Sequence, residues 1–178
     1  IPKDIPNIDD LKLPAVIKQI ALEPRGLILI TGTTGSGKST SIASMINYIN
    51  TQQSSHIITI EDPIEFMFND AKSSISQREV GIDTDSFSLA LKYSLRQDPD
   101  VIFIGEMRDL ETVSACMSAA ETGHLVVSTL HTIDTLQTVD RVLDFFPANQ
   151  QVQMRGQFAN TLTAIISMRL VTRSDGKG

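Results

Sequence analysis

The sequence is poor in cysteine, in aromatic residues and in positive charge. Its 178 residues contain one cysteine and no tryptophan, and aromatic residues make up 5% of the chain. The single cysteine excludes an internal disulfide, and a structural zinc site would need more ligands than it offers. The formal net charge is −6. We therefore expect no nucleic-acid partner, because such proteins use clustered lysine and arginine and, for single strands, stacking aromatic rings.

Long hydrophobic runs are also missing. Apolar segments such as Val101–Ile104 fall far short of the roughly 20 residues needed to cross a bilayer. No secretory leader is recognisable. We therefore expect a cytoplasmic protein without a transmembrane segment. The first residue is Ile1 rather than Met, which suggests a fragment or a processed chain.

Short apolar segments with strand character alternate with longer helical patterns along the chain. We expect strands at Leu27–Thr31, His56–Ile60, Ser73–Glu79, Val101–Gly105 and Leu125–Thr129. We expect helices from Asp9 or Asp10 to Leu22 and at Lys38–Asn50, Ser86–Gln97, Leu110–Thr122, Thr135–Phe145 and Asn149–Ser167. This alternation predicts an α/β fold in which a parallel sheet carries helices on both faces. Such sheets bind ligands at the carboxyl ends of their strands.

A glycine-rich segment follows the first expected strand. Gly32–Ser39 matches the pattern G-x-x-x-x-G-K-[ST] at every fixed position. Glycines let backbone N–H groups close around phosphate oxygens, and the start of the following helix attracts the anion. Lys38 is expected to reach the β- and γ-phosphates, Ser39 to bind Mg²⁺ and Thr40 to line the α-phosphate side. The predicted cofactors are ATP and Mg²⁺, and the predicted nucleotide-binding residues are Gly32, Thr33, Thr34, Gly35, Ser36, Gly37, Lys38, Ser39 and Thr40.

Three further motifs follow this loop in order. Ile57–Glu65 resembles the Asp box of secretion and type IV pilus ATPases, Asp98–Asp109 resembles their Walker B segment, and Thr122–Thr132 resembles their His box. Four motifs in one order are much more specific than any one of them alone. The resemblance implies a P-loop NTPase with a RecA-like core that hydrolyses ATP.

Within that superfamily the chain resembles the PilT-like retraction branch. Met168–Val171 runs into Ser174–Gly178 without the four-cysteine zinc module typical of secretion and pilus-extension ATPases. Asp140–Pro147 is similar to a segment of the retraction branch. The resemblance implies a motor core that powers type IV pilus retraction and twitching motility. It also implies a hexameric homo-oligomer that works with an inner-membrane pilus platform, peripherally at the cytoplasmic face.

Two other functions remain open. One is a type II secretion or pilus-extension ATPase of the same superfamily, and the other is a low-turnover, nucleotide-gated regulatory subunit. From the family pattern we expect residues 1–26 to be a lead-in linker and short helix from a missing N-terminal domain. Residues 27–178 would then be a RecA-like ATPase domain truncated at its C-terminal end. Because some activating arginines of relatives lie in the missing domain, we expect this chain to bind ATP but to hydrolyse it slowly.

Hydrolysis also needs a carboxylate that orients or deprotonates water. By resemblance, Glu106 belongs to the metal, through bound water, and Glu65 is the candidate general base. Asp62 and Glu106 compete with Glu65 for the base role. Glu61 and Asp62 could instead only cap the strand end and hydrogen-bond the turn at Pro63.

The two histidines of the His box are expected to differ. If Leu125–Thr129 lies between the P-loop strand and the Walker B strand, His131 emerges beside the γ-phosphate, where we assign it a sensing role. His124 starts the same strand, roughly 20 Å away. We expect it to serve an interface or strand-cap role, with a link to a neighbouring subunit's nucleotide as the alternative. Four arginines are candidates for interface or trans-acting contacts, although each is more often a surface residue: Arg78, Arg96, Arg108 and Arg141.

Overall fold

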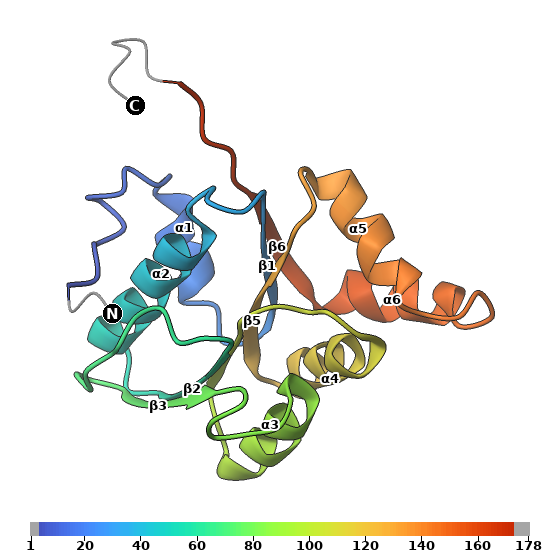
Figure 1. Cartoon of the computed structure of the whole chain (residues 1–178), viewed down its shortest axis with the longest axis horizontal. Coiled ribbons are helices and arrows are strands. Elements are labelled where there is room, and N and C mark those ends of the chain that lie inside the picture. Colours follow the sequence, from blue (N-terminus) through green and yellow to red (C-terminus); the bar gives the residue numbers. More distant parts are fainter. Residues whose placement is uncertain (1–3, 173–178) are drawn as a thin grey trace.

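The computed structural model describes residues 4–172, and its centre is one parallel β-sheet (Figure 1). The spatial order of the six strands is β3-β2-β4-β5-β1-β6. Every neighbouring pair is parallel. The strands are β1 (Gly26–Thr31), β2 (His56–Glu61), β3 (Ser74–Glu79), β4 (Val101–Ile104), β5 (Leu125–Leu130) and β6 (Leu162–Ser167). The parallel sheet predicted from the sequence is therefore confirmed.

Helices cover both faces of this sheet, as expected (Figure 1). Helices α1 and α2 pack on one face, and α3, α4 and α6 pack on the other. The helices are α1 (Val16–Ala21), α2 (Lys38–Gln52), α3 (Phe87–Ser94), α4 (Leu110–Glu121), α5 (Thr135–Asp144) and α6 (Gln151–Thr161), with a short 3₁₀ turn, η1 (Leu95–Gln97), after α3. Among residues 4–172, none of these helices combines the length and hydrophobicity that crossing a bilayer requires.

Strand β1 shows why the sheet is buried on both sides. Side chains of successive strand residues point to opposite faces, so Leu27 and Leu29 enter the cluster under α3 and α4. Ile28 and Ile30 enter the cluster under α1 and α2. All four are fully buried. Each such burial contributes about 1.5–3 kcal/mol relative to an exposed side chain, which fixes the strand that carries the glycine loop.

Three helices begin at a side chain that caps their free N–H groups. Ser86 accepts a hydrogen bond from the backbone of Leu89 at the start of α3. Asp109 caps α4 and Asp134 caps α5 in the same way. Such a cap stabilises a helix by about 1 kcal/mol. These caps explain why the predicted starts of the three helices lie within a residue of the observed ones.

One predicted element was wrong. We expected a single helix over Asn149–Ser167, but α6 ends at Thr161 and strand β6 begins at Leu162. Strand β6 pairs in parallel with β1, which adds a sixth strand that the sequence reading did not foresee. The helix expected from Asp9 or Asp10 is also shorter, since α1 begins only at Val16.

The lead-in before β1 packs onto the domain. Ile8 and Ile17 are buried in the same cluster as α2, and Lys18 pairs with Asp9 at 2.7 Å. At the other end, the chain leaves β6 and extends away from the sheet (Figure 1). The Ser174–Gly178 segment, in which no four-cysteine zinc module is found by sequence, lies outside the described residues.

Candidate active site

The motifs meet at the carboxyl ends of four neighbouring strands. Strand β5 lies between β4 and β1, so the strand that joins the two histidines stands between the Walker B strand and the P-loop strand, as predicted. Their ends surround a cavity of about 390 Å³. Its charged and polar lining residues include Lys38, Ser39, Thr40, Glu61, Asp62, Glu65, Glu106 and His131.

The glycine loop joins β1 to α2 in the conformation that its sequence predicts. Gly37 has a φ of 94° and stands at the N-cap of α2, a left-handed conformation that favours glycine. At Gly32, φ is 146°, and an added Cβ would collide with the carbonyl oxygen of Met168 and the Oγ of Ser36. The start of α2 therefore presents free N–H groups and the positive end of its dipole to the cavity.

Lys38 is the first residue of α2 and is only 9% exposed. Its Nζ donates hydrogen bonds to the carbonyl oxygens of Gly32 (2.7 Å) and Thr33 (3.1 Å). Burial lowers the pKa of Lys38, and the negative charge of Glu65 opposes that shift. The ammonium therefore lies directly over the loop, where a phosphate would meet it.

Ser39 and Glu65 form the contact that joins the P-loop to the Asp box. The Ser39 hydroxyl donates a 2.6 Å hydrogen bond to Oε1 of Glu65. Among the described residues, no group of three or more His, Cys, Asp or Glu side chains could hold a metal ion. A magnesium ion fits this donor set nevertheless, because Mg²⁺ usually takes one or two protein ligands and completes its shell with phosphate oxygens and water.

Glu106, which follows β4, is engaged through both carboxylate oxygens. Its Oε1 pairs with Nε of Arg108, and its Oε2 lies 3.1 Å from Nε2 of His131. Arg108 also donates from Nη1 to Oδ2 of Asp62 at 3.2 Å. Arg108, a candidate for contacts between subunits, thus bridges two acids of its own site. Of the acids competing for the base role, Glu65 is the one that contacts Ser39.

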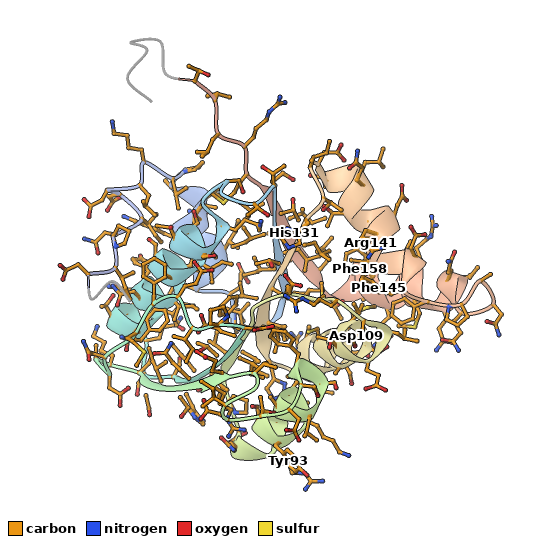
Figure 2. All side chains as sticks on the ribbon, in the orientation of Figure 1. Tyr93, Asp109, His131, Arg141, Phe145 and Phe158 are labelled. Atoms are coloured by element: carbon orange, nitrogen blue, oxygen red, sulfur yellow. The ribbon has the colours of Figure 1, made fainter. Side chains whose placement is uncertain are left out.

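His131 lies just beyond the end of β5 (Figure 2), and its Nε2 is 3.1 Å from Oε2 of Glu106. Burial lowers the pKa of His131, and the positive charges of Lys38 and Arg108 lower it further. All three effects favour the neutral imidazole, which can both donate and accept hydrogen bonds. This placement agrees with the predicted position of His131 at the cavity.

His124 lies at the opposite end of β5, as expected. Its Nδ1 lies 2.9 Å from the carbonyl oxygen of Ala119 near the end of α4. Its own carbonyl accepts a hydrogen bond from the Gly26 backbone at 3.0 Å. Within the chain, His124 therefore joins the end of α4 to the starts of β5 and β1, and it does not line the cavity.

Glu61 is a buried carboxyl at the end of β2, only 7% exposed. Its Oε1 accepts hydrogen bonds from Thr59 (2.7 Å) and Gln77 (3.3 Å). Burial raises the pKa of Glu61, while these hydrogen bonds oppose that shift. The contacts support the reading in which Glu61 stabilises the strand end, although the residue also lines the cavity.

Three of the four arginines rest on aromatic rings of the same chain. Arg141, on α5, lies 4.6 Å from the ring centre of Phe145, which follows the helix (Figure 2). Arg96 lies over the ring of Tyr93 and Arg108 over that of Phe87. A cation–aromatic contact of this kind contributes about 0.5–1 kcal/mol at exposed sites. Each of these three arginines therefore has a stabilising partner within its own chain.

The sequence reading missed residues that shape the cavity behind the charged groups. Phe66, Phe68 and Phe103 line its apolar side together with Ile42 and Ile46 of α2. Ile42 and Ile46 are recognisable from the helical spacing of α2. The phenylalanines come from two separate places in the chain, the loop after β2 and strand β4, and only the fold brings them together.

The chain matches a protein family and several characterised relatives. The family model "Type II/IV secretion system protein" matches residues 9–177. The chain is 52% identical over 178 residues to the twitching motility protein of Neisseria gonorrhoeae, covering all of this chain and 48% of that protein. It is 48% identical over 176 residues to the type IV pilus retraction ATPase PilT of Pseudomonas aeruginosa, covering 99% of this chain and 51% of PilT.

Solved structures agree with these matches. The chain resembles a crystal structure of the pilus retraction motor PilT with bound ADP at a TM-score of 0.96 and 56% identity, covering 99% of this chain and 51% of that one. The predicted fold class, with its P-loop on a parallel sheet, is that of this relative. The chain spans about half the length of the relatives it matches.

Proposed function

Because the chain belongs to the type II/IV secretion system protein family, we propose that it is the ATP-hydrolysing core of a motor that retracts type IV pili. The observation that carries the proposal is the Ser39–Glu65 contact at the mouth of the glycine loop. It places a carboxylate beside the hydroxyl expected to bind Mg²⁺, in one cavity with Lys38 and Glu106. The twitching motility and retraction names of the relatives direct the choice towards retraction.

The proposed reaction is hydrolysis of ATP to ADP and phosphate. Water attacks the γ-phosphorus, the bond to the β,γ-bridging oxygen breaks, and Glu65 accepts the proton of the attacking water. Lys38 neutralises charge on the β- and γ-phosphates. A bound Mg²⁺, held by Ser39 and through water by Glu106, would neutralise phosphate charge. His131, which is hydrogen-bonded to Glu106, would sense the γ-phosphate.

We place this core within a larger assembly. Residues 1–26 would lead in from an N-terminal domain, and residues 27–178 would form the ATPase domain up to a truncated C-terminal end. The assembled form would be a hexameric ring at the cytoplasmic face of the inner membrane, acting on a pilus platform. We therefore expect the 178-residue chain alone to hydrolyse ATP slowly and more actively at higher protein concentration. Vigorous hydrolysis independent of concentration would contradict this.

The proposed function is tested by phosphate release from ATP and Mg²⁺, with Lys38→Met as the disabling variant. Removing a charged hydrogen bond costs about 1.5–3 kcal/mol, so nucleotide affinity should fall about 10- to 100-fold. Lys92→Met, at an exposed lysine of α3, should bind and hydrolyse ATP normally. A full-length protein that binds ATP without turnover would support the regulatory alternative. Turnover without pilus retraction in cells would support the secretion or extension alternative.

A further inference from the structure

The edge strand β3 holds the loop that carries Glu65. The Oε1 of Gln77 accepts a 2.9 Å hydrogen bond from the backbone N–H of Phe68. Its Nε2 donates to the carbonyl oxygen of Phe66 at 2.8 Å and to Oε1 of Glu61 at 3.3 Å. Because one backbone partner is a donor and the other an acceptor, only one orientation of the amide satisfies both.

A second side chain of β3 holds the same loop on the other side of Glu65. Glu79 lies two residues after Gln77, and its Oε2 accepts a 3.0 Å hydrogen bond from the Ile64 backbone. Residues two apart on a strand share one face. The backbone is therefore held before Glu65 and after it, and between these points Glu65 reaches Ser39.

We propose that Gln77 is a positioning residue for Glu65, an inference that rests on the proposed function. Its amide fixes the backbone of residues 66–68 relative to the buried end of β2, and this sets how closely Glu65 approaches Ser39. Gln77 is not among the residues that line the cavity, so it would act through the loop that carries Glu65 and not by touching the nucleotide. Without the amide, Glu65 would sample other positions, and turnover would fall while nucleotide binding stayed.

The loop has a separate attachment that does not depend on Gln77. Asn50, at the end of α2, donates to the carbonyl oxygen of Asn69 (2.8 Å) and accepts from the Ala71 backbone (3.0 Å). Asn50 is buried. Replacing Gln77 should therefore loosen residues 66–68 without releasing the loop or unfolding the domain.

The first test compares Gln77→Met with Ser76→Ala in the full-length protein. Methionine keeps the length of the side chain and removes its hydrogen bonds, whereas the Ser76 side chain makes no hydrogen bond to any residue within 4–172. We expect Gln77→Met to lower kcat about tenfold with nucleotide affinity within twofold of wild type, and Ser76→Ala to change neither. An unchanged kcat for Gln77→Met overturns the inference.

The second test separates positioning from a general structural role. If Gln77 acts through Glu65, adding Gln77→Met to Glu65→Gln should change the residual single-turnover rate less than twofold, because the two substitutions remove the same effect. A further tenfold loss would show an independent role and overturn the inference.

The third test is independent of activity. Amide hydrogen exchange at Phe68, whose N–H is bonded to Gln77, should be at least about tenfold faster in Gln77→Met than in wild type, whereas exchange in β1 should be unchanged. Unchanged exchange at Phe68 overturns the inference whether or not the wild type hydrolyses ATP. A wild type without turnover, by contrast, overturns the proposed function.

Discussion

The hydroxyl of Ser39 donates a 2.6 Å hydrogen bond to Oε1 of Glu65, which joins the first turn of α2 to the loop after β2. Asp62, three residues before Glu65, instead accepts a hydrogen bond from Arg108. Glu106 is shared between Arg108 and His131. Among these three acids, the described contacts thus leave Glu65 as the carboxylate next to the P-loop hydroxyl.

Glu65→Gln should abolish turnover while nucleotide still binds. Loss of a general base costs about 10²- to 10⁴-fold in rate, so we expect kcat to fall at least about 100-fold, measured by phosphate release. Affinity for a fluorescent ATP analogue should stay within about threefold. Glu23→Gln, at an exposed carboxyl before β1, is the matched control. Near-normal turnover by Glu65→Gln would move the base role to Glu106 or Asp62.

Replacing His131 and replacing His124 should affect turnover and assembly differently. His131→Ala removes one of the two partners of Glu106 and should lower turnover with little change in nucleotide affinity. His124→Ala should keep nucleotide binding, since His124 lies at the far end of β5, but should lose the activity that depends on assembly. Sedimentation and phosphate release over a range of protein concentrations check both. Loss of nucleotide binding in His124→Ala would contradict the proposed separation of roles.

Glu61 should make stability depend on pH. Its folded pKa is raised above the ordinary value of 4.5, so the folded state holds the proton more tightly than the unfolded state. The free energy of unfolding attributable to Glu61 then falls as pH rises from about 4.5 through the raised pKa. Glu61→Gln removes this loss. At pH 8 we expect its Tm to exceed that of wild type by about 2–4 °C, equivalent to about 1 kcal/mol.

Thermal melts of wild type and Glu61→Gln between pH 4.5 and 8 measure this effect. The advantage of the variant should shrink as the pH falls towards 4.5, because the folded wild-type carboxyl becomes protonated over this range. A variant less stable than wild type at pH 8 would mean that the hydrogen bonds from Thr59 and Gln77 require the carboxylate charge.

Cys116 should be unreactive in the folded protein. It is fully buried in α4, and burial raises the pKa of its thiol to about 12. Because the thiolate is the reactive form, a thiol reagent at pH 8 should react at least about 100-fold more slowly with the folded chain than with the chain in urea. Cys116 is the sole cysteine in the sequence, so the signal has one source. Rapid reaction under native conditions would contradict this burial.

Strand β6 shows where a local sequence pattern fails to determine the fold. Thr161 ends α6 and the next residue, Leu162, begins β6. Neither is glycine or proline, so no helix-breaking residue marks the boundary. The run of Thr163, Ile165 and Ile166 has strand character, but it is half-buried and short. Its strand conformation depends on pairing with β1, a contact more than 130 residues away in the chain, which no local window contains.

The residues of the candidate site also differ in whether a local sequence pattern predicts them. Lys38 and Ser39 were predictable because one short motif carries both their chemistry and their geometry. Gln77 was not, because on an edge strand a single glutamine looks like any solvated polar residue. Its three partners, Glu61, Phe66 and Phe68, are brought to it only when the loop folds back over β3.

The pairing of β6 with β1 also gives the domain a mechanical property. The two strands are parallel, so the start of β1 and the end of β6 lie at opposite ends of the pair. Tension between the lead-in and the segment after Met168 would therefore act in shear and stretch the hydrogen bonds of the pair together rather than peel them apart one by one. Met168 itself donates a 2.7 Å hydrogen bond to the carbonyl oxygen of Thr31, and its carbonyl lies against Gly32. The phosphate loop thus begins at one end of the strand pair that would carry such a tension.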